Sequence, residues 1–177
     1  MAVRFDVDGV IPLSIVKLGR GTTHKWNKIA NNPSADTQYE FDNGYVYRTD
    51  GEKRVSYVQA DLKYDPWYRN AYQQRIAGKD CRLDTDCGGL LIGAVFGGPG
   101  EALNLVPMDR TLNGGGGQWG VMERVWKGYL DQGQSVKVDI KPIYTGGSRR
   151  PDRFEVTFRV DGGDEIRRTI SNTATGQ

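Results

Sequence analysis

Two side chains near the middle of the chain, Asn113 and Glu123, are of the type and spacing that could hold a metal ion. The segment after Asn113 carries apolar residues at i, i+3, i+4, i+7 and i+8, namely Met122, Val125, Trp126, Tyr129 and Leu130. This spacing predicts an amphipathic helix. Trp119 and Glu123, four residues apart on one flank of that helix, direct the carboxylate toward the preceding strands. The amide oxygen of Asn113 and the carboxylate of Glu123 then suit a hard divalent cation.

The stretch before this helix must position both ligands. It runs from Asp86 through a glycine-dense loop, a short apolar strand, a Gly-Gly-Pro-Gly turn and a second strand that contains Asn104. With the helix that Asn113 is expected to open, this order predicts a compact ββα unit. The four glycines at 114–117 lack the Lys-Ser/Thr ending of a phosphate-binding loop. We interpret them as the passage from Asn113 into the helix, in which glycine lets the backbone lie close to a bound strand.

The motifs of this stretch, taken in order, resemble the catalytic core of the DNA/RNA non-specific endonucleases of the ββα-metal (His-Me finger) superfamily. The similar segment is GGLLIGAVFGGPGEALNLVPMDRTLNGGGGQWGVME, and the resemblance is to the branch that often ends secreted bacterial toxins. The family pattern runs Gly-His-Leu-Ile, Phe-Gly-Gly, Asn-Leu-Val-Pro, Leu-Asn, and Trp followed by Met-Glu. Each part is present, except that Leu90 stands where the family has histidine. The similarity extends from Tyr39 to Asp161.

This resemblance implies a metal-dependent endonuclease for DNA or RNA, with Mg²⁺ or Mn²⁺ held by Asn113 and Glu123. In these enzymes the histidine is the general base, because an imidazole pKa lies near the working pH. Leu90 has no ionisable group, so the resemblance implies a form that is inactive or severely impaired. His24, the only histidine, lies outside the similar region. The alternative hypothesis is a natural pseudo-nuclease that binds nucleic acid or a protein partner.

Other positions acquire supporting roles through the same resemblance. Asp86, Asn104 and Trp119 match family positions around the site. Downstream arginines are candidates for phosphate contacts, although interleaved acidic residues also fit a mixed solvated surface; they are Arg149, Arg150 and Arg153. The toxin branch further implies a cognate immunity protein that protects the producing cell. It also implies a secreted or injected effector that acts in the cytoplasm of a target cell.

Two pairs of residues before the core motif leave alternatives open. Cys81 and Cys87 could close a small disulfide or remain reduced thiols, and their spacing matches no zinc site. Asp84 and Asp86 could form a carboxylate pair for acid–base chemistry, but a solvated loop is favoured.

Length and composition narrow the function classes. A chain of 177 residues fits one domain with a sizeable core. Its net charge of +2 predicts that any nucleic-acid contact comes from local patches rather than a general polyanion-coating surface. The sequence contains no apolar run near the roughly 20 residues that span a bilayer. Its first residues are too charged to open a signal peptide, so export by the general secretory route is not expected.

The remaining patterns predict an α+β fold, a twisted antiparallel sheet that carries the ββα-metal finger on one side. A hairpin over 2–19 turns at Asp8-Gly9, and a second turns at Asn43-Gly44. A short helix has Pro66 in its first turn and ends at Gly78. Alternating patterns predict strands that begin near 55, 136 and 154. We expect N-terminal strands and a linker over 1–37, where Trp26 and Ile29 dock a short helix, a nuclease domain over 38–171, and a frayed tail over 172–177.

Overall fold

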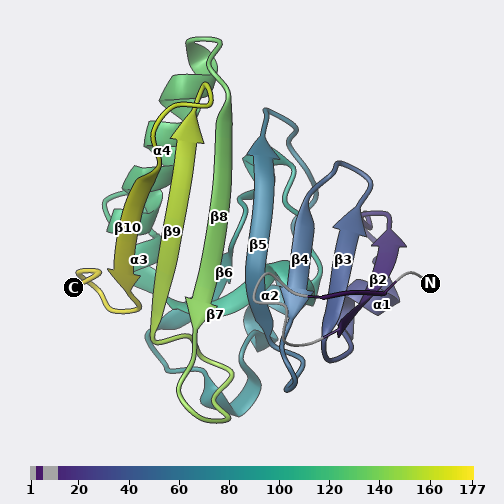
Figure 1. Cartoon of the computed structure of the whole chain (residues 1–177). Coiled ribbons are helices and arrows are strands. Elements are labelled where there is room, and N and C mark those ends of the chain that lie inside the picture. The colour runs from purple at the N-terminus through teal and green to yellow at the C-terminus, as the bar shows by residue number, and fades with distance from the viewer. Residues whose placement is uncertain (1–2, 6–11) are drawn as a thin grey trace.

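One long twisted sheet organises the chain, and a smaller unit packs on one of its faces (Figure 1). The computed structural model describes residues 3–5 and 12–177. The sheet has the order β1-β2-β3-β4-β5-β8-β9-β10. Its strands are β1 (Val3–Phe5), β2 (Pro12–Leu18), β3 (Thr37–Phe41), β4 (Val46–Thr49), β5 (Val55–Leu62), β8 (Val136–Ile143), β9 (Arg153–Val160) and β10 (Ile166–Ser171). Neighbours in the sheet are antiparallel except for the parallel pair β2–β3. The expected α+β class with a mostly antiparallel twisted sheet is confirmed.

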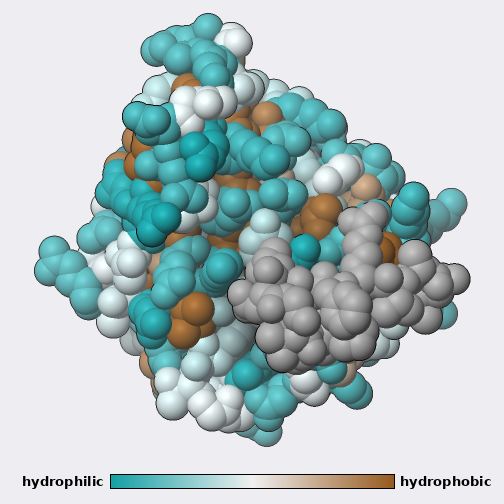
Figure 2. Space-filling view, in the orientation of Figure 1, coloured by the Kyte–Doolittle hydropathy of each residue, from teal (hydrophilic) through white to brown (hydrophobic). Residues whose placement is uncertain are grey.

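The smaller unit is the expected ββα finger. It consists of the hairpin β6 (Asp86–Leu90) and β7 (Leu105–Asp109), followed by α3 (Arg110–Asn113) and α4 (Gln118–Asp131). Figure 1 shows these elements behind the half of the sheet formed by β8, β9 and β10. The other face of the sheet is open and mostly hydrophilic (Figure 2), as the alternation of polar residues on β8 and β9 predicts. No helix in the described ranges has the length and apolar character that crossing a membrane requires.

The main core lies between the sheet and α4. Trp119 packs on Phe154 with ring centroids 4.9 Å apart, and Trp126 packs on Phe158 at 5.8 Å. The helical stripe was predicted correctly at Met122 and Trp126, which are buried, whereas Tyr129 and Leu130 pack at its margin. Val125 is 37% exposed, contrary to the expectation. The buried face centres on Trp119, Met122 and Trp126, and this places Val125 on the solvent side.

The finger differs in detail from the sequence-based expectation. The first strand contains the glycines instead of following them, and Ala94–Phe96 forms a 3-10 turn, not a strand. The first strand needs glycine at position 88, because the backbone of Gln74 lies where a side chain of residue 88 would be. Asn113 ends α3 and does not open the long helix, which begins at Gln118 after Gly117. The glycines at 114–117 connect these two helices, as predicted, and their approach to a bound strand stays a prediction.

Other local patterns folded largely as predicted. The Asn43-Gly44 turn joins β3 to β4. The short helix predicted around 66–78 is α2 (Ala71–Ile76), which starts later than expected because the Asn70 side chain caps it by accepting the Gln73 N–H at 3.2 Å. In the N-terminal segment α1 (Lys28–Asn31) forms the expected short helix, but Ile29 is 54% exposed and does not dock. β1 pairs antiparallel with β2, and the predicted turn at Asp8-Gly9 lies outside the described residues.

The C-terminal segment is tied to the finger. Asn172 is buried, donates to the carbonyls of Pro107 at 3.0 Å and Pro151 at 2.8 Å, and accepts the Asp109 N–H at 2.9 Å. Gln118 donates to the Thr175 carbonyl at 2.7 Å. The start of the segment expected to fray is therefore held between β7 and the sheet. The division into 1–37, 38–171 and 172–177 stays a prediction, although β2 already belongs to the common sheet.

Candidate functional site

Leu90 ends β6, at the position where the resemblance expects a histidine. It pairs with Leu105 across the hairpin and is only 6% exposed. Its neighbours in a small apolar cluster are Ala77, Ala94 and Leu105. The position thus holds a packed hydrocarbon side chain with no proton acceptor.

Glu123 reaches the loop that follows Leu90. A side chain at Gly93 would collide with Oε2 of Glu123, because a Cβ there would lie 2.8 Å from that oxygen. Burial raises the pKa of Glu123 to about 7, while the positive charges of Arg69 and Lys127 lower it. The carboxyl group accepts no hydrogen bond from the described part of the chain. A half-buried carboxyl group without donors, poised to ionise near neutral pH, is suited to receive a cation.

Asn113, at the end of α3, approaches strand β6. Asp109 caps α3 by accepting the N–H groups of Thr111 at 2.8 Å and Leu112 at 3.1 Å, which fixes the short helix that carries Asn113. The Nδ2 of Asn113 donates to Sγ of Cys87 at 3.3 Å. Because the nitrogen side of the amide is engaged, Oδ1 is left without a donor among the described residues.

The two candidate ligands therefore contact the hairpin on either side of Leu90. Asn113 donates to Cys87, three residues before it, and the Glu123 carboxyl group occupies the space beside Gly93, three residues after it. Within residues 3–5 and 12–177, no group of three or more His, Cys, Asp or Glu side chains gathers in a metal-binding arrangement. Two oxygen ligands still fit Mg²⁺, which keeps several water molecules and is often held by one or two protein groups.

Asp86 and Arg150 form a buried ion pair that the sequence did not predict. Arg150 donates to both carboxylate oxygens of Asp86, from Nε at 2.8 Å and from a terminal nitrogen at 2.9 Å. The Asp86 side chain is 0% exposed and the Arg150 side chain 15% exposed. Arg150 also donates to the Asn172 carbonyl at 3.0 Å. Arg150 is thus a structural tie between β6 and the β8–β9 loop, and not the exposed phosphate contact that the sequence suggested. Asp84 is exposed and forms no pair with Asp86.

Arg149 and Arg153 differ in their surroundings. Arg153, on β9, is 45% exposed and lies 3.5 Å from the Glu155 carboxylate. Arg149, in the loop after β8, donates to the Glu52 carbonyl at 3.3 Å and lines a cavity beside β7. A role for either in nucleic-acid binding stays a prediction.

Asn104 and Trp119 are buried residues that hold the loop after Leu90 and the start of α4 in place. Asn104 is fully buried and donates to the carbonyls of Ile92 and Pro99, both at 2.9 Å. Its Oδ1 accepts from the Ile92 N–H at 3.0 Å and from the Tyr47 hydroxyl at 2.6 Å. These bonds hold the loop after Leu90 and tie it to the sheet. Trp119 anchors the first turn of α4 in the core, one turn before Glu123.

Sequence reasoning missed an acidic residue that clamps the N-terminal segment. Glu101 is fully buried, and its Oε1 accepts the backbone N–H groups of Gly21 at 2.6 Å and Asn27 at 3.1 Å. Arg20 adds bonds to Asp65 at 2.8 Å and to the Gly97 carbonyl at 3.1 Å. The predicted linker is therefore packed against the 97–101 turn. The only local signal was the charge of Glu101 inside an otherwise apolar run.

The histidine and the two thiols singled out in the sequence have no catalytic arrangement, although Cys87 accepts the hydrogen bond from Asn113. His24 is exposed, with a left-handed backbone (φ 66°), in the turn between Thr22 and Lys25. Cys81 and Cys87 are both unbonded, half-buried thiols, which corresponds to the reduced alternative.

Comparisons with known proteins agree on one family. A family model described as DNA/RNA non-specific endonuclease matches residues 35–162. The type VII secretion system protein EssD of Staphylococcus aureus (strain USA300) is 34% identical over 142 residues, which are 77% of this chain and 23% of EssD. The same protein of strain NCTC 8325 gives the same values. The chain thus spans less than a quarter of the length of these curated relatives.

Solved structures share the fold. The crystal structure of NucA from Streptococcus agalactiae with no metal bound has a TM-score of 0.58 and 21% identity, covering 82% of this chain and 81% of that one. The NucA structure with a magnesium ion bound has a TM-score of 0.56 and 19% identity, covering 82% of both chains. At this identity the similarity shows the arrangement of sheet and finger alone.

Proposed function

Because the chain belongs to the DNA/RNA non-specific endonuclease family, we propose that it is a metal-dependent nuclease domain whose general base has been replaced by Leu90. The observation that carries this proposal is the approach of Asn113 and Glu123 to the β6 hairpin on either side of that residue. Both present an oxygen that lacks a hydrogen-bond donor within the described ranges.

We infer that Asn113 and Glu123 hold Mg²⁺ or Mn²⁺. When bound, the ion would neutralise charge on the scissile phosphate and on the leaving oxygen. The protein contributes the orientation of the Asn113 amide and a carboxylate kept out of bulk water. Arg69, whose charge lowers the Glu123 pKa, supplies positive charge beside the same group. A histidine at position 90 would accept the proton of the attacking water. Leucine leaves binding and orientation in place and removes this step.

The experiment is to replace Leu90 by histidine and to measure cleavage of plasmid DNA and RNA with Mg²⁺ or Mn²⁺. General bases contribute about 10²- to 10⁴-fold in rate, so cleavage should rise by that factor and be abolished by EDTA. Leu90→Gln is the matched control, because it introduces polarity of similar size without a base. In the histidine background, Asn113→Ala and Glu123→Ala should weaken cleavage.

The pseudo-nuclease is the second candidate, favoured by the packing of Leu90 against Ala77, Ala94 and Leu105. In this case the domain would occupy nucleic acid or a protein partner without cutting. A folded Leu90→His protein that stays inert with both metals, while the parent chain binds nucleic acid, would favour this alternative.

We also propose that the domain is the toxic part of a longer effector of a specialised secretion system, acting on nucleic acid in the cytoplasm of a target cell. The similarity to a part of EssD supports this proposal. The active form of such a nuclease requires a cognate immunity protein in the producing cell. Co-expression with the neighbouring reading frame should give a complex that co-elutes in size-exclusion chromatography, and separate elution at micromolar concentration would contradict it.

A further inference from the structure

A cavity of about 490 Å³ opens beside the candidate site, on the α2 side of the finger. Its walls come from α2, β7, the end of α1, the start of β5 and the loop after β8. Ala77 and Leu105, two of its wall residues, are also the residues that pack against Leu90. A ligand in the cavity would therefore be separated from position 90 by a single layer of side chains.

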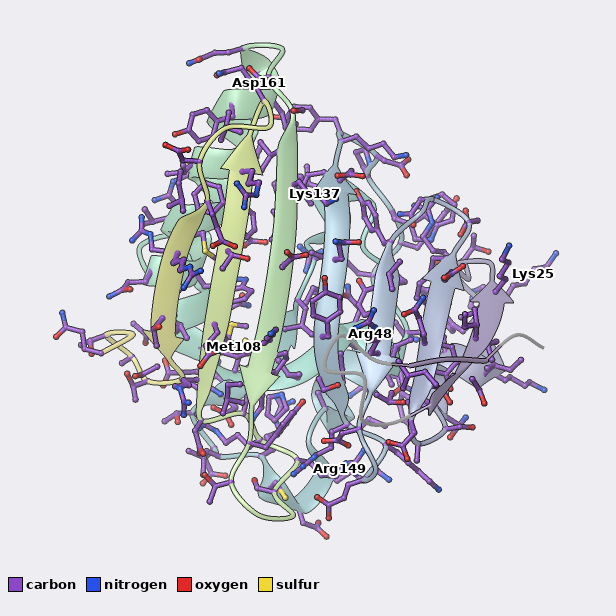
Figure 3. The ribbon with its side chains drawn as sticks, viewed as in Figure 1. Lys25, Arg48, Met108, Lys137, Arg149 and Asp161 are labelled. Carbon is purple, nitrogen blue, oxygen red and sulfur yellow. The ribbon has the colours of Figure 1, made fainter. Side chains whose placement is uncertain are left out.

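Positive charge dominates this cavity. Four cationic residues and no acidic one are among its described wall residues, and the cations are Lys53, Arg54, Lys79 and Arg149. Arg54 is neutralised, since it pairs with Asp50 at 2.8 Å and with Glu52 at 3.0 Å. Lys53, Lys79 and Arg149 form no ion pair with the described residues. Figure 3 shows Arg149 at the lower end of the sheet, where the loop after β8 approaches the cavity. Three cations from separate parts of the chain thus face one space.

An exposed aromatic ring completes the cavity. Tyr72, on α2, is 58% exposed, and the Arg75 guanidinium carbon lies 5.8 Å from its ring centroid. An exposed tyrosine ring beside cations offers the two features that single-stranded nucleic acid uses, a stacking surface and phosphate contacts.

We propose that this cavity, which we name the basic pocket, binds an unpaired nucleotide of the substrate strand next to the position of cleavage. The base stacks on Tyr72, and Lys53, Lys79 and Arg149 contact the adjoining phosphates. This inference rests on the proposed nuclease function and adds a preference for single-stranded or locally opened nucleic acid. A base that is paired and stacked in a duplex would first have to leave its stack to enter the pocket.

The test uses the chain as it is, because without its general base it should hold substrate for long enough to measure binding. Fluorescence anisotropy with Mg²⁺ compares a labelled 12-nucleotide single strand with the 12-base-pair duplex. Tyr72→Ala should weaken single-strand binding about 5- to 100-fold, the range typical of losing one stacked base. Tyr72→Phe should restore it, and duplex binding should change less than threefold. Tyr64→Ala is the matched control, because it removes an exposed tyrosine that follows β5 and whose hydroxyl donates to Asp131 at the end of α4.

The second part of the test removes three positive charges of the pocket in the triple variant Lys53→Gln, Lys79→Gln, Arg149→Gln. Each phosphate contact on a single strand contributes about 0.7 to the slope of log K against log salt, so the slope should shrink by about 2. The control triple is Lys25→Gln, Lys28→Gln, Lys137→Gln, which removes the same charge. Figure 3 places Lys25 at the β2 edge and Lys137 on the open face of the sheet. The control should leave the slope unchanged within 0.5.

Unchanged single-strand affinity in Tyr72→Ala together with an unchanged slope in the pocket triple would overturn the inference. Displacement of the strand by free AMP as effectively as by unlabelled 12-mer would also overturn it, in favour of a free-nucleotide site. Failure of the underlying function looks different. In that case the parent chain would bind neither form of nucleic acid, and Asn113→Ala would not alter Mn²⁺ binding.

Discussion

The buried pair of Asp86 and Arg150 should contribute more to stability than any other polar contact around the finger. Asp86→Ala removes the two bonds from Arg150 and also the bond that its Oδ2 accepts from the Leu83 N–H at 2.9 Å. It leaves the guanidinium only 15% exposed, with the Asn172 carbonyl as its remaining partner in the described chain. Breaking such a pair by removing one partner costs about 3–5 kcal/mol.

The assay is urea denaturation followed by tryptophan fluorescence, with a thermal melt alongside. For a chain of this length each 1 kcal/mol lowers the melting temperature by roughly 2–4 °C, so Asp86→Ala should lower it by about 6–20 °C. The double variant Asp86→Ala, Arg150→Met removes both charges and should recover at least about 2 kcal/mol relative to the sum of the single variants.

The same double variant tests whether Arg150 has a structural role or contacts nucleic acid. Because the Arg150 guanidinium is occupied by Asp86, its removal should leave affinity for a 12-nucleotide strand within twofold at 15 °C. A destabilisation below 1 kcal/mol for Asp86→Ala would refute the energetic reasoning. A tenfold loss of affinity in the folded double variant would instead restore Arg150 as a phosphate contact.

Two further predictions concern the candidate metal ligands. Cys87→Ala should weaken Mn²⁺ binding about tenfold, because Cys87 accepts the hydrogen bond that orients the Asn113 amide, and such partners of metal ligands typically contribute 10- to 100-fold. Cys87→Ser should retain Mn²⁺ binding, and Cys81→Ala should have no effect on it. Equal calorimetric affinities for the three variants would contradict this. Burial raises the pKa of Glu123 to about 7, so protons compete with the metal below that pH. Mn²⁺ affinity should therefore fall as pH is lowered from 7.5 to 6 and level off above 7.5, and a flat profile would exclude Glu123 as a ligand.

Short-range signals in the sequence predicted the elements well. The Asn43-Gly44 turn, the strands of the sheet and the stripe of α4 each depend on residues that are close in sequence. Errors arose where a tertiary contact changed a local preference. Gly88 occupies a strand position that has no room for a side chain, because the Gln74 backbone lies there. Val125 faces solvent because the buried face of α4 includes Trp119.

The polar ties that position the finger could not be predicted in the same way. Arg150 meets Asp86 across 64 residues, and the Gly21 N–H meets Glu101 across 80. Neither pair belongs to a periodic pattern, and a charged side chain looks alike in sequence whether it is solvated or buried. For this reason the sequence leaves Arg150 as a candidate phosphate contact on a mixed surface, and it predicts a linker within 1–37.

These ties also explain why a change of residue at position 90 need not disturb the rest of the candidate site. The hairpin is held by Asp86 with Arg150, by the Asn104 bonds to Ile92 and Pro99, and by the Asn172 bonds at β7. None of them involves the side chain at position 90. Leu90 adds only apolar contacts with Leu105 and two alanines. Hence the scaffold that presents Asn113 and Glu123 does not depend on the side chain at position 90, and under the proposed function binding can persist when the general base is absent.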